Sequence, residues 1–224
     1  MTFSLVARSA DAGLFGIAIA SSSPAVAARC AHARAGVGAV GTQNITDPSL
    51  GSRVLDALGR GSSAQAALDQ VLSTTPFGAY RQLVIIGRSG PPAIYCGAHG
   101  LGLVGSASGQ DAAAAGNLLA NAGVPAAMLE AFDQATGHLG ERLLEGLRHG
   151  LALGGEAGPV HSAGLLIVRE VSWPIVDLRV DWSEEDPIAA LCALWRRYAP
   201  QIDDYVRRAV DPIRAPSFGV PGNP

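Results

Sequence analysis

The sequence contains no lysine, and all 16 of its basic side chains are arginines. A lysine Schiff base and a lysine general base are therefore excluded. The guanidinium group of arginine stays protonated, so it can stabilise a negative charge but cannot accept a proton. Base chemistry near neutral pH falls to the five histidines and to the α-amino group, whose reference pKa of about 7.7–8.0 suits that role.

Cysteine is also scarce. Cys30, Cys96 and Cys192 are odd in number, lie far apart and include no Cys-x-x-Cys motif. This pattern argues against a disulfide framework and a zinc site, and it favours a reducing compartment. The histidines show no His-x-His or His-Glu-x-x-His spacing, so we expect no metal ligands and no cofactor. We expect the protein to be cytoplasmic.

An excess of positive charge and long apolar runs are missing too. The net charge is −3 and the isoelectric point is about 5.9, so the sequence lacks the basic surface that a nucleic-acid partner requires. No apolar run approaches the ~18 residues of a membrane-spanning helix. Residues 14–20, followed by Ala25-Val26-Ala27, resemble a secretion signal, but the run is short and Asp11 precedes it. We expect neither a membrane partner nor secretion.

Apolar residues make up 48% of the 224 positions, which is enough for the core of a single domain. Apolar runs bounded by turn residues predict strands at residues 3–8, 14–20, 33–41, 83–87, 93–96, 101–106, 111–117, 163–169 and 175–180. Capping residues and apolar periodicity predict helices that begin near residues 47, 62, 125, 139 and 186, the last one bent near Pro200. Ser62 and Gln65 form a capping-box pattern, and residues 9–13 predict a turn.

The order of these elements predicts the fold class. Strands, two helices, strands, two helices and strands favour an α+β fold in which two mostly antiparallel sheets stack between helix pairs, a four-layer αββα sandwich. A doubly wound parallel sheet would need alternating strands and helices and a glycine-rich phosphate loop, which the sequence lacks. We assign residues 1–210 to one domain and residues 211–224 to a proline-rich tail, an arm that would lie on a partner subunit.

Thr2 is the most informative residue. Initiator methionine is usually removed when a small residue follows it, which here would leave a hydroxyl and a free α-amine together at the head of a strand. A threonine activated by its own N-terminal amine is an established kind of nucleophile. The alternative is that Thr2 only starts a strand, because β-branched residues favour strands.

Several stretches resemble the bacterial "domain of unknown function 1028" family, which is placed in the N-terminal-nucleophile (Ntn) hydrolase superfamily together with proteasome β-subunits. These stretches, which cover most of residues 2–190, are TFSLVAR, GIAIASSSPAVAAR, AGVGAVGTQNITDPSLG, YRQLVII, AAGNLLA, GLLIV and VDLRVDWSEEDPI. The resemblance implies an Ntn-hydrolase-like sandwich whose mature chain begins with the nucleophile.

The resemblance also implies roles for single residues. Thr2 would be the nucleophile and its amine the base, and Ser21 stands where related proteins hold a carboxylate. Thr42 would supply a backbone N–H of an oxyanion hole at a helix N-terminus. Asn117, in a loop, would orient the amine, and Glu156 would be the acidic residue that accompanies it.

The chain departs from its family between residues 154 and 162. Family members commonly read Gly-Gly-Asp-x-Arg-Gly-x-Gln-Ser, whereas this chain reads Gly-Gly-Glu-Ala-Gly-Pro-Val-His-Ser. The arginine and glutamine are absent, which implies either a different substrate or a site that has lost its activity.

The predicted substrate-binding residues are Ser22, Arg34, Gln43, Asn44, Arg81 and His161. Gln43 and Asn44 would recognise an amide or a carboxylate, or would only precede a helix cap. Arg81 would bind a carboxylate through two hydrogen bonds or form an ion pair at a strand end. Arg34 would replace the lysine of proteasome-like relatives, and His161 would line a pocket or be structural.

Three functional hypotheses follow. The first is an N-terminal-threonine amidohydrolase that cleaves a small amide or other C–N substrate through an acyl-enzyme. The second is a catalytically inactive ligand-binding or assembly protein with the same fold. The third is an enzyme with an internal nucleophile such as Ser4 or Ser21. In each case we expect a small-molecule ligand and a homo-oligomer, a dimer or larger, because a Gly/Ala-rich surface and a proline-rich arm suit a symmetric assembly.

Overall fold

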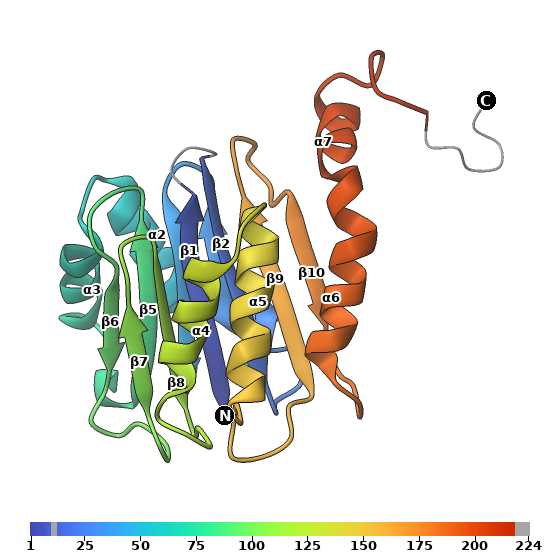
Figure 1. Ribbon diagram of the computed structural model, residues 1–224. Coiled ribbons are helices and arrows are strands. Elements are labelled where there is room, and N and C mark those ends of the chain that lie inside the picture. The colour runs from blue at the N-terminus through green and yellow to red at the C-terminus, as the bar shows by residue number, and fades with distance from the viewer. Residues whose placement is uncertain (10–12, 218–224) are drawn as a thin grey trace.

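Two antiparallel sheets lie face to face in the computed structural model, which describes residues 1–9 and 13–217 (Figure 1). The larger sheet consists of β1 (Thr2–Ser9), β2 (Leu14–Ser21), β7 (Gly105–Ser108), β8 (Ala112–Asn117), β9 (Ser162–Val168) and β10 (Val176–Val180). The smaller sheet consists of β3 (Ala31–Arg34), β4 (Gly38–Asn44), β5 (Arg81–Gly87) and β6 (Ala93–Cys96). Their spatial orders are β10-β9-β2-β1-β8-β7 and β3-β4-β5-β6.

Helices cover the outer faces of both sheets. α2 (Ser49–Gly59) and α3 (Ala64–Leu72) share a core layer with the smaller sheet. α4 (Val124–Gln134), α5 (Leu139–Ala152) and α6 (Pro187–Tyr198) share another with the larger sheet. Two short helices, α1 (Val26–Cys30) and the 3-10 helix η1 (Gly78–Tyr80), connect strands. The predicted α+β fold, an αββα sandwich of four layers, is therefore confirmed.

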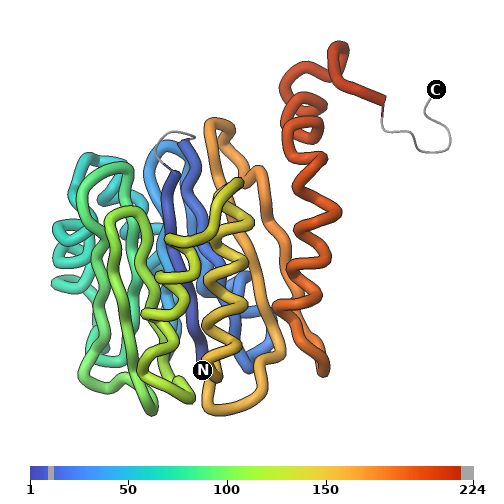
Figure 2. The backbone as a smooth tube through the Cα atoms, viewed as in Figure 1, coloured from blue at the N-terminus to red at the C-terminus, as the bar shows by residue number. Residues whose placement is uncertain are grey.

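The C-terminal helix is divided by a proline. α6 ends at Tyr198, the 3-10 helix η2 (Ala199–Gln201) contains Pro200, and α7 (Ile202–Val210) follows. Proline lacks the N–H that a continuing helix needs, so the predicted bend is a break. Figure 2 shows α6 beside β10 and α7 continuing beyond the end of that strand, with residues 211–217 leading away from the sandwich. Residues 10–12 of the predicted turn and 218–224 of the predicted tail lie outside the described residues.

Three local predictions are corrected. Residues 33–41 are not one strand, because Gly36 takes a φ of +69° and the chain turns there between β3 and β4. Ser63, not Ser62, caps α3 by accepting a hydrogen bond from the N–H of Ala66. The strand predicted at 101–106 begins only at Gly105. In the described parts of the chain, no helix is long and apolar enough to cross a bilayer.

β1 lies in the middle of the larger sheet, and its two faces have different surroundings. Phe3 and Leu5 point into the core beneath α4 and α5, whereas Val6 points into the layer between the sheets. Ser4 and Arg8 point the same way as Val6, because side chains alternate along a strand, and both bind groups of the smaller sheet. Thr2 lies two residues before Ser4 on the same strand, so it also belongs to the face that meets the smaller sheet.

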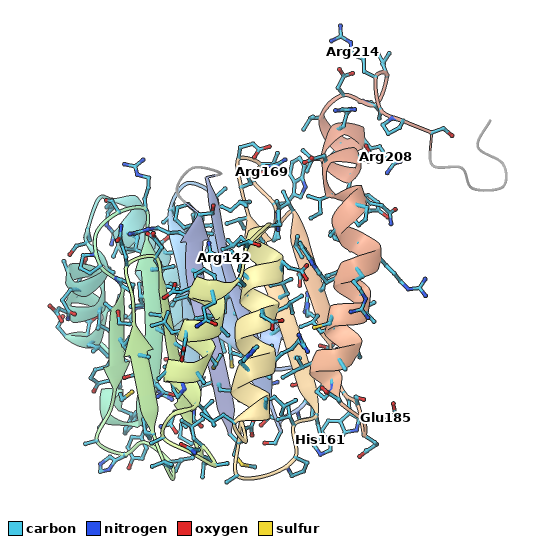
Figure 3. All side chains as sticks on the ribbon, in the orientation of Figure 1. Arg142, His161, Arg169, Glu185, Arg208 and Arg214 are labelled. Carbon is cyan, nitrogen blue, oxygen red and sulfur yellow. The ribbon has the colours of Figure 1, made fainter. Side chains whose placement is uncertain are left out.

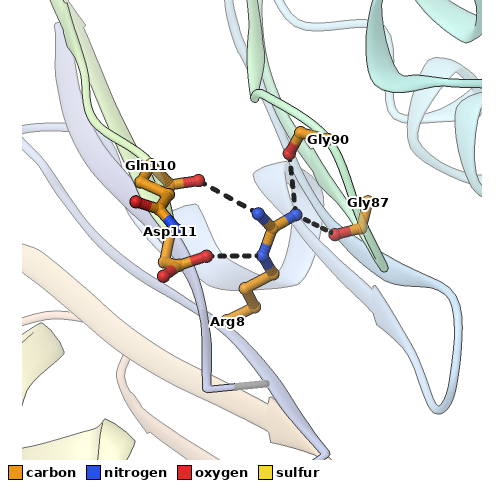
Figure 4. Close-up of polar contacts among 5 residues, drawn as sticks. All are labelled: Arg8, Gly87, Gly90, Gln110 and Asp111. Carbon is orange, nitrogen blue, oxygen red and sulfur yellow. Dashed lines mark hydrogen bonds and ion pairs between the residues drawn. The ribbon is translucent and has the colours of Figure 1, made fainter.

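Arg8 closes one end of the space between the sheets (Figure 4). Its Nε donates to Asp111 Oδ1 over 2.8 Å, and its Nη2 donates to the carbonyl oxygen of Gln110. Its Nη1 donates to the carbonyl oxygens of Gly87 and Gly90, which belong to the smaller sheet and the turn after it. Only 8% of the Arg8 side chain is exposed. The guanidinium group therefore joins the two sheets through one buried set of charge-assisted hydrogen bonds.

We expect Arg8→Met to lower the free energy of unfolding by about 2–4 kcal/mol, because the carbonyl groups lose a charged donor. Arg8→Lys should lower the free energy of unfolding by about half that amount, because an ammonium group lacks the planar, paired donors of a guanidinium group. Arg179→Met is the matched control: its ion pair with Asp177 is exposed, so it should contribute about 1 kcal/mol or less. Denaturant unfolding measures all three, and equal losses at positions 8 and 179 would contradict the assignment.

Candidate active site

The head of β1 brings Thr2 next to the ends of its two neighbouring strands. Thr2 pairs with Asn117, the last residue of β8, and Phe3 pairs with Ala20 of β2. The Thr2 Oγ1 consequently lies 3.4 Å from the Oγ of Ser21. Thr2 is only 6% exposed, and Ser21 and Asn117 are buried. Asn117 ends β8, which agrees with the strand predicted over residues 111–117 and not with the loop that the family resemblance implied.

Met1 covers this position. Its carbonyl oxygen accepts hydrogen bonds from Thr2 Oγ1, over 2.5 Å, and from Ser21 Oγ. While Met1 is present, the Thr2 hydroxyl is engaged in that contact and the Thr2 nitrogen is an amide rather than an amine. Nucleophilic chemistry at Thr2 therefore requires removal of Met1.

Glu156 is the acidic residue at this site. It follows Gly155, which takes a φ of +57°, and it is 3% exposed. Its Oε1 accepts from the backbone N–H of Ser22 over 2.9 Å, while its Oε2 has no hydrogen-bond partner among the described residues. Burial raises the pKa of the carboxyl group from 4.5 to about 7, against the opposing effects of the chain's amino terminus, the Ser22 hydrogen bonds and His161.

Asn117 presents a second buried acceptor. Its Nδ2 donates to Gln82 Oε1 over 3.0 Å, and its Oδ1 has no partner among the described residues. Buried polar atoms are nearly always hydrogen-bonded, so an unsatisfied one requires an explanation. Two such acceptors, Asn117 Oδ1 and Glu156 Oε2, belong to residues at the head of β1.

His161 lies at the same end of the sandwich as the amino terminus (Figure 3). Its backbone N–H donates to the carbonyl oxygen of Ser21 over 2.9 Å. Its Nδ1 lies 2.7 Å from the carbonyl oxygen of Ser183, and since a carbonyl only accepts, Nδ1 carries the proton. The ring stacks on Trp182 with centroids 4.3 Å apart. His161 is thus fixed by structural contacts and also contributes to the electrostatics of Glu156.

Two predicted substrate-binding residues, Arg34 and Asn44, make other contacts in the structure. Arg34 lies at the opposite end of the sandwich, because its strand partner Gly38 pairs with Gly87, whose carbonyl oxygen binds Arg8. Arg34 also forms an exposed ion pair with Asp56. The side-chain amide of Asn44, by contrast, is hydrogen-bonded to backbone groups: it donates to the carbonyl oxygens of residues 80 and 99 and accepts from the N–H of residue 101.

Arg81 and Thr42 also differ from expectation. Arg81 donates through Nη1 to the carbonyl oxygen of Ile45, the residue that follows β4. Thr42 lies inside β4, paired with Leu83, and α2 begins only at Ser49. Thr42 therefore does not lie at a helix N-terminus, and that part of the expectation is wrong; its role as an oxyanion-hole donor stays a prediction. Its buried Oγ1 instead donates to the carbonyl oxygen of Arg29.

Gln82 was not among the predicted site residues, although it contacts the site. The side-chain amide of Gln43 is hydrogen-bonded inside the protein: its Oε1 accepts from Ser4 Oγ over 2.7 Å and its Nε2 donates to Gln82 Oε1 over 2.8 Å. Gln82 contacts Asn117 as described above. The signal was a polar residue beside the apolar positions of a strand: Ser4 lies between Phe3 and Leu5, and Gln82 directly precedes the apolar residues 83–86. Such a residue needs a buried partner.

The fold and the site define a class of protein: an αββα sandwich with a threonine at the head of a central strand. The chain belongs to the DUF1028 family, a family of unknown function, whose model matches residues 2–191. It is similar to the crystal structure of protein SPO2555 from Silicibacter pomeroyi, which is described with the same family. The identity is 29%, the TM-score is 0.83, and the match covers 91% of this chain and 94% of that one. No curated protein matches the sequence.

The raised pKa of Glu156 predicts a pH-dependent stability. The unfolded carboxyl group ionises near 4.5 and the folded one near 7. Between these values the unfolded state binds fewer protons, so stability falls as the pH rises. Relative to Glu156→Gln, the parent chain should lose about 3 kcal/mol of unfolding free energy between those pH values. Denaturant unfolding of both proteins across this range measures the difference, and parallel curves would contradict the assignment.

Proposed function

We propose that the protein is an Ntn-type hydrolase that cleaves a small amide or other C–N substrate with Thr2 as nucleophile. One observation carries the proposal: the buried acceptors Asn117 Oδ1 and Glu156 Oε2, at the head of β1, lack donors among the described residues. An α-amine on Thr2 would supply those donors. The αββα layering and the match to DUF1028 support membership of the Ntn superfamily.

Removal of Met1 creates the catalytic group. Thr2 then carries an α-amine whose reference pKa of about 7.7–8.0 leaves part of it neutral at physiological pH. Asn117 Oδ1 and Glu156 Oε2 orient this amine by accepting its hydrogens. In its neutral form the amine takes the proton of the Thr2 hydroxyl, as in other N-terminal threonine nucleophiles.

The reaction then proceeds in two steps. Thr2 Oγ1 attacks the substrate carbonyl carbon, the C–N bond breaks, and the amine passes the proton to the leaving nitrogen. This leaves an ester on Thr2, which water hydrolyses with the same amine as base. Ser21 Oγ, which donates to the carbonyl oxygen of Met1, is placed to donate to a substrate oxygen at that position.

The second candidate function is a non-catalytic ligand-binding or assembly protein. It is favoured by the contact in which the Met1 carbonyl oxygen engages the hydroxyls of both Thr2 and Ser21. A serine also cannot supply the negative charge of the carboxylate that related proteins hold at position 21. Intact-mass spectrometry tests the hydrolase: a chain that keeps Met1 excludes it, whereas a chain that begins at Thr2 is compatible with both functions, which the nucleophile variants below then separate.

We expect Thr2→Ala to abolish hydrolysis, a loss of at least about 1000-fold in kcat/KM, because the attacking oxygen is gone. Thr2→Ser should keep measurable activity, since it retains both hydroxyl and amine. The assay uses a panel of small amides, ureas and cyclic imides, with mass spectrometry to detect an acyl adduct on the N-terminal peptide.

Ser4→Ala is the matched control for this experiment. It removes another hydroxyl from the same face of β1, two residues further on, and should leave the adduct at Thr2. Thermal unfolding confirms that all variants fold. Full activity in Thr2→Ala, or an adduct on Ser4 or Ser21, would rule out Thr2 as the nucleophile.

We also propose that the chain assembles into a homo-oligomer through its C-terminal arm. Val210 is 60% exposed and Ile213 is 94% exposed, and burying these apolar side chains against a second copy of the chain would be favourable. In analytical ultracentrifugation, a chain that ends at residue 210 should therefore form particles with fewer subunits than the parent chain does. An unchanged number of subunits would contradict this role for the arm.

A further inference from the structure

A row of buried polar side chains crosses from one sheet to the other and ends at the candidate active site. Ser4 of β1, Gln43 of β4, Gln82 of β5 and Asn117 of β8 are each at most 2% exposed. Ser4 Oγ donates to Gln43 Oε1 over 2.7 Å, Gln43 Nε2 to Gln82 Oε1 over 2.8 Å, and Asn117 Nδ2 to Gln82 Oε1 over 3.0 Å. The row therefore connects both sheets to Asn117.

Two backbone carbonyl groups determine which way these amides face. A carbonyl oxygen can only accept, so an amide beside it must present its NH2 group. Gln82 Nε2 donates to the carbonyl oxygen of Gly116 over 2.9 Å, and Gln43 Nε2 donates to that of Ala115 over 3.0 Å. The Gln82 carbonyl oxygen is consequently turned toward Gln43 and Asn117.

The orientation of Asn117 follows from the same rule. Because Gln82 offers it a carbonyl oxygen, Asn117 must direct its NH2 group toward Gln82. The oxygen and nitrogen of an amide are distinguished by such partners rather than by shape. Asn117 Oδ1 is then turned away from Gln82, which leaves it without a donor among the described residues.

We propose that Gln82 is a positioning residue, which orients the Asn117 amide so that its carbonyl oxygen, and not its NH2 group, faces the Thr2 amine. This inference rests on the proposed function, because it requires an amine at Thr2. Gln82 acts only through Asn117 and touches no reacting atom. If the Asn117 amide were reversed, its NH2 group would face the N–H groups of the Thr2 amine. Two sets of donors would then face each other, which would destabilise the protonated amine.

Other charged groups near the chain's amino terminus remain unchanged when Gln82 is replaced. Glu156 and Cys30 both respond electrostatically to the amino group of Met1, while His161 acts on Glu156 and Arg29 acts on Cys30. All of these groups are the same in the parent chain and in Gln82→Met. A change in the titration of the Thr2 amine on replacing Gln82 therefore reports the Asn117 amide.

The absence of lysine makes the test specific, because the α-amine is the single aliphatic amine of the chain. Protein that begins at Thr2, prepared by cleaving an N-terminal fusion and verified by mass, is acylated with an N-hydroxysuccinimide ester at a series of pH values. The reaction rate follows the neutral fraction of the amine. Gln82→Met should move the midpoint to lower pH by about half a pH unit or more, because the ammonium loses an acceptor.

Gln43→Met is the matched control. It removes an equally buried amide of the same row, but Gln82 keeps its anchor at Gly116 and so still orients Asn117. Its midpoint should equal that of the parent, although both variants lose stability. Gln82→Met should also have no effect in an Asn117→Leu background, since a residue that acts through another loses its effect when that residue is absent.

Several outcomes would overturn the inference: an unchanged midpoint in Gln82→Met, an equal shift in Gln43→Met, or a shift that persists with Asn117→Leu. Where Gln82→Met does not fold, NMR of the parent protein decides. Nuclear Overhauser effects from the Asn117 NH2 group to Gln82 are expected, and effects to Thr2 instead would overturn it. The test measures the titration of the amine and not hydrolysis. A chain that begins at Thr2 and is inactive would therefore contradict the proposed function without affecting the inference about Gln82.

Discussion

The antiparallel pairing of β1 with β2 and β8 is the constraint on which the rest of the site depends. Side chains alternate along a strand, so a slip of one residue would turn Thr2 away from the smaller sheet and expose the apolar residues of the opposite face. Phe3 and Leu5, fully buried beneath the helices, stabilise the observed register. With that register, Thr2 meets the last residues of both neighbouring strands, Ser21 and Asn117.

The two ends of the space between the sheets differ in their polar groups: one end presents hydrogen-bond donors and the other presents acceptors. At one end Arg8 supplies donors, and each of its nitrogens has a partner. At the other end Asn117 and Glu156 supply acceptors, and one oxygen of each lacks a donor among the described residues. Folding tolerates such unsatisfied groups mainly where function requires them. The satisfied end stabilises the sandwich, and the unsatisfied end is where we propose that the reaction takes place.

Much of the architecture was predictable because apolar periodicity and capping residues act locally. The strands at β1, β2, β5 and β9 and the helices α4 and α5 lie close to the predicted positions. The hairpin at Gly36 was missed because its flanking alanines and glycines suit a continuous buried strand equally well. Arg34 was predicted to bind substrate, but the turn at Gly36 pairs it with Gly38, at the end of the sandwich where Arg8 binds Gly87.

The site was predictable in part. The resemblance to a family brought Thr2, Ser21, Asn117 and Glu156 to attention, and the fold places them at one end. No local pattern could reveal the partnership of Gln82 with Asn117, because these residues are 35 positions apart and belong to different sheets. The sequence by itself determined the αββα layers and the chemistry available, including a threonine at position 2 and no lysine. Only the tertiary structure decided which polar groups are buried together and which remain unsatisfied, because hydrogen bonding between sheets depends on how the sheets stack.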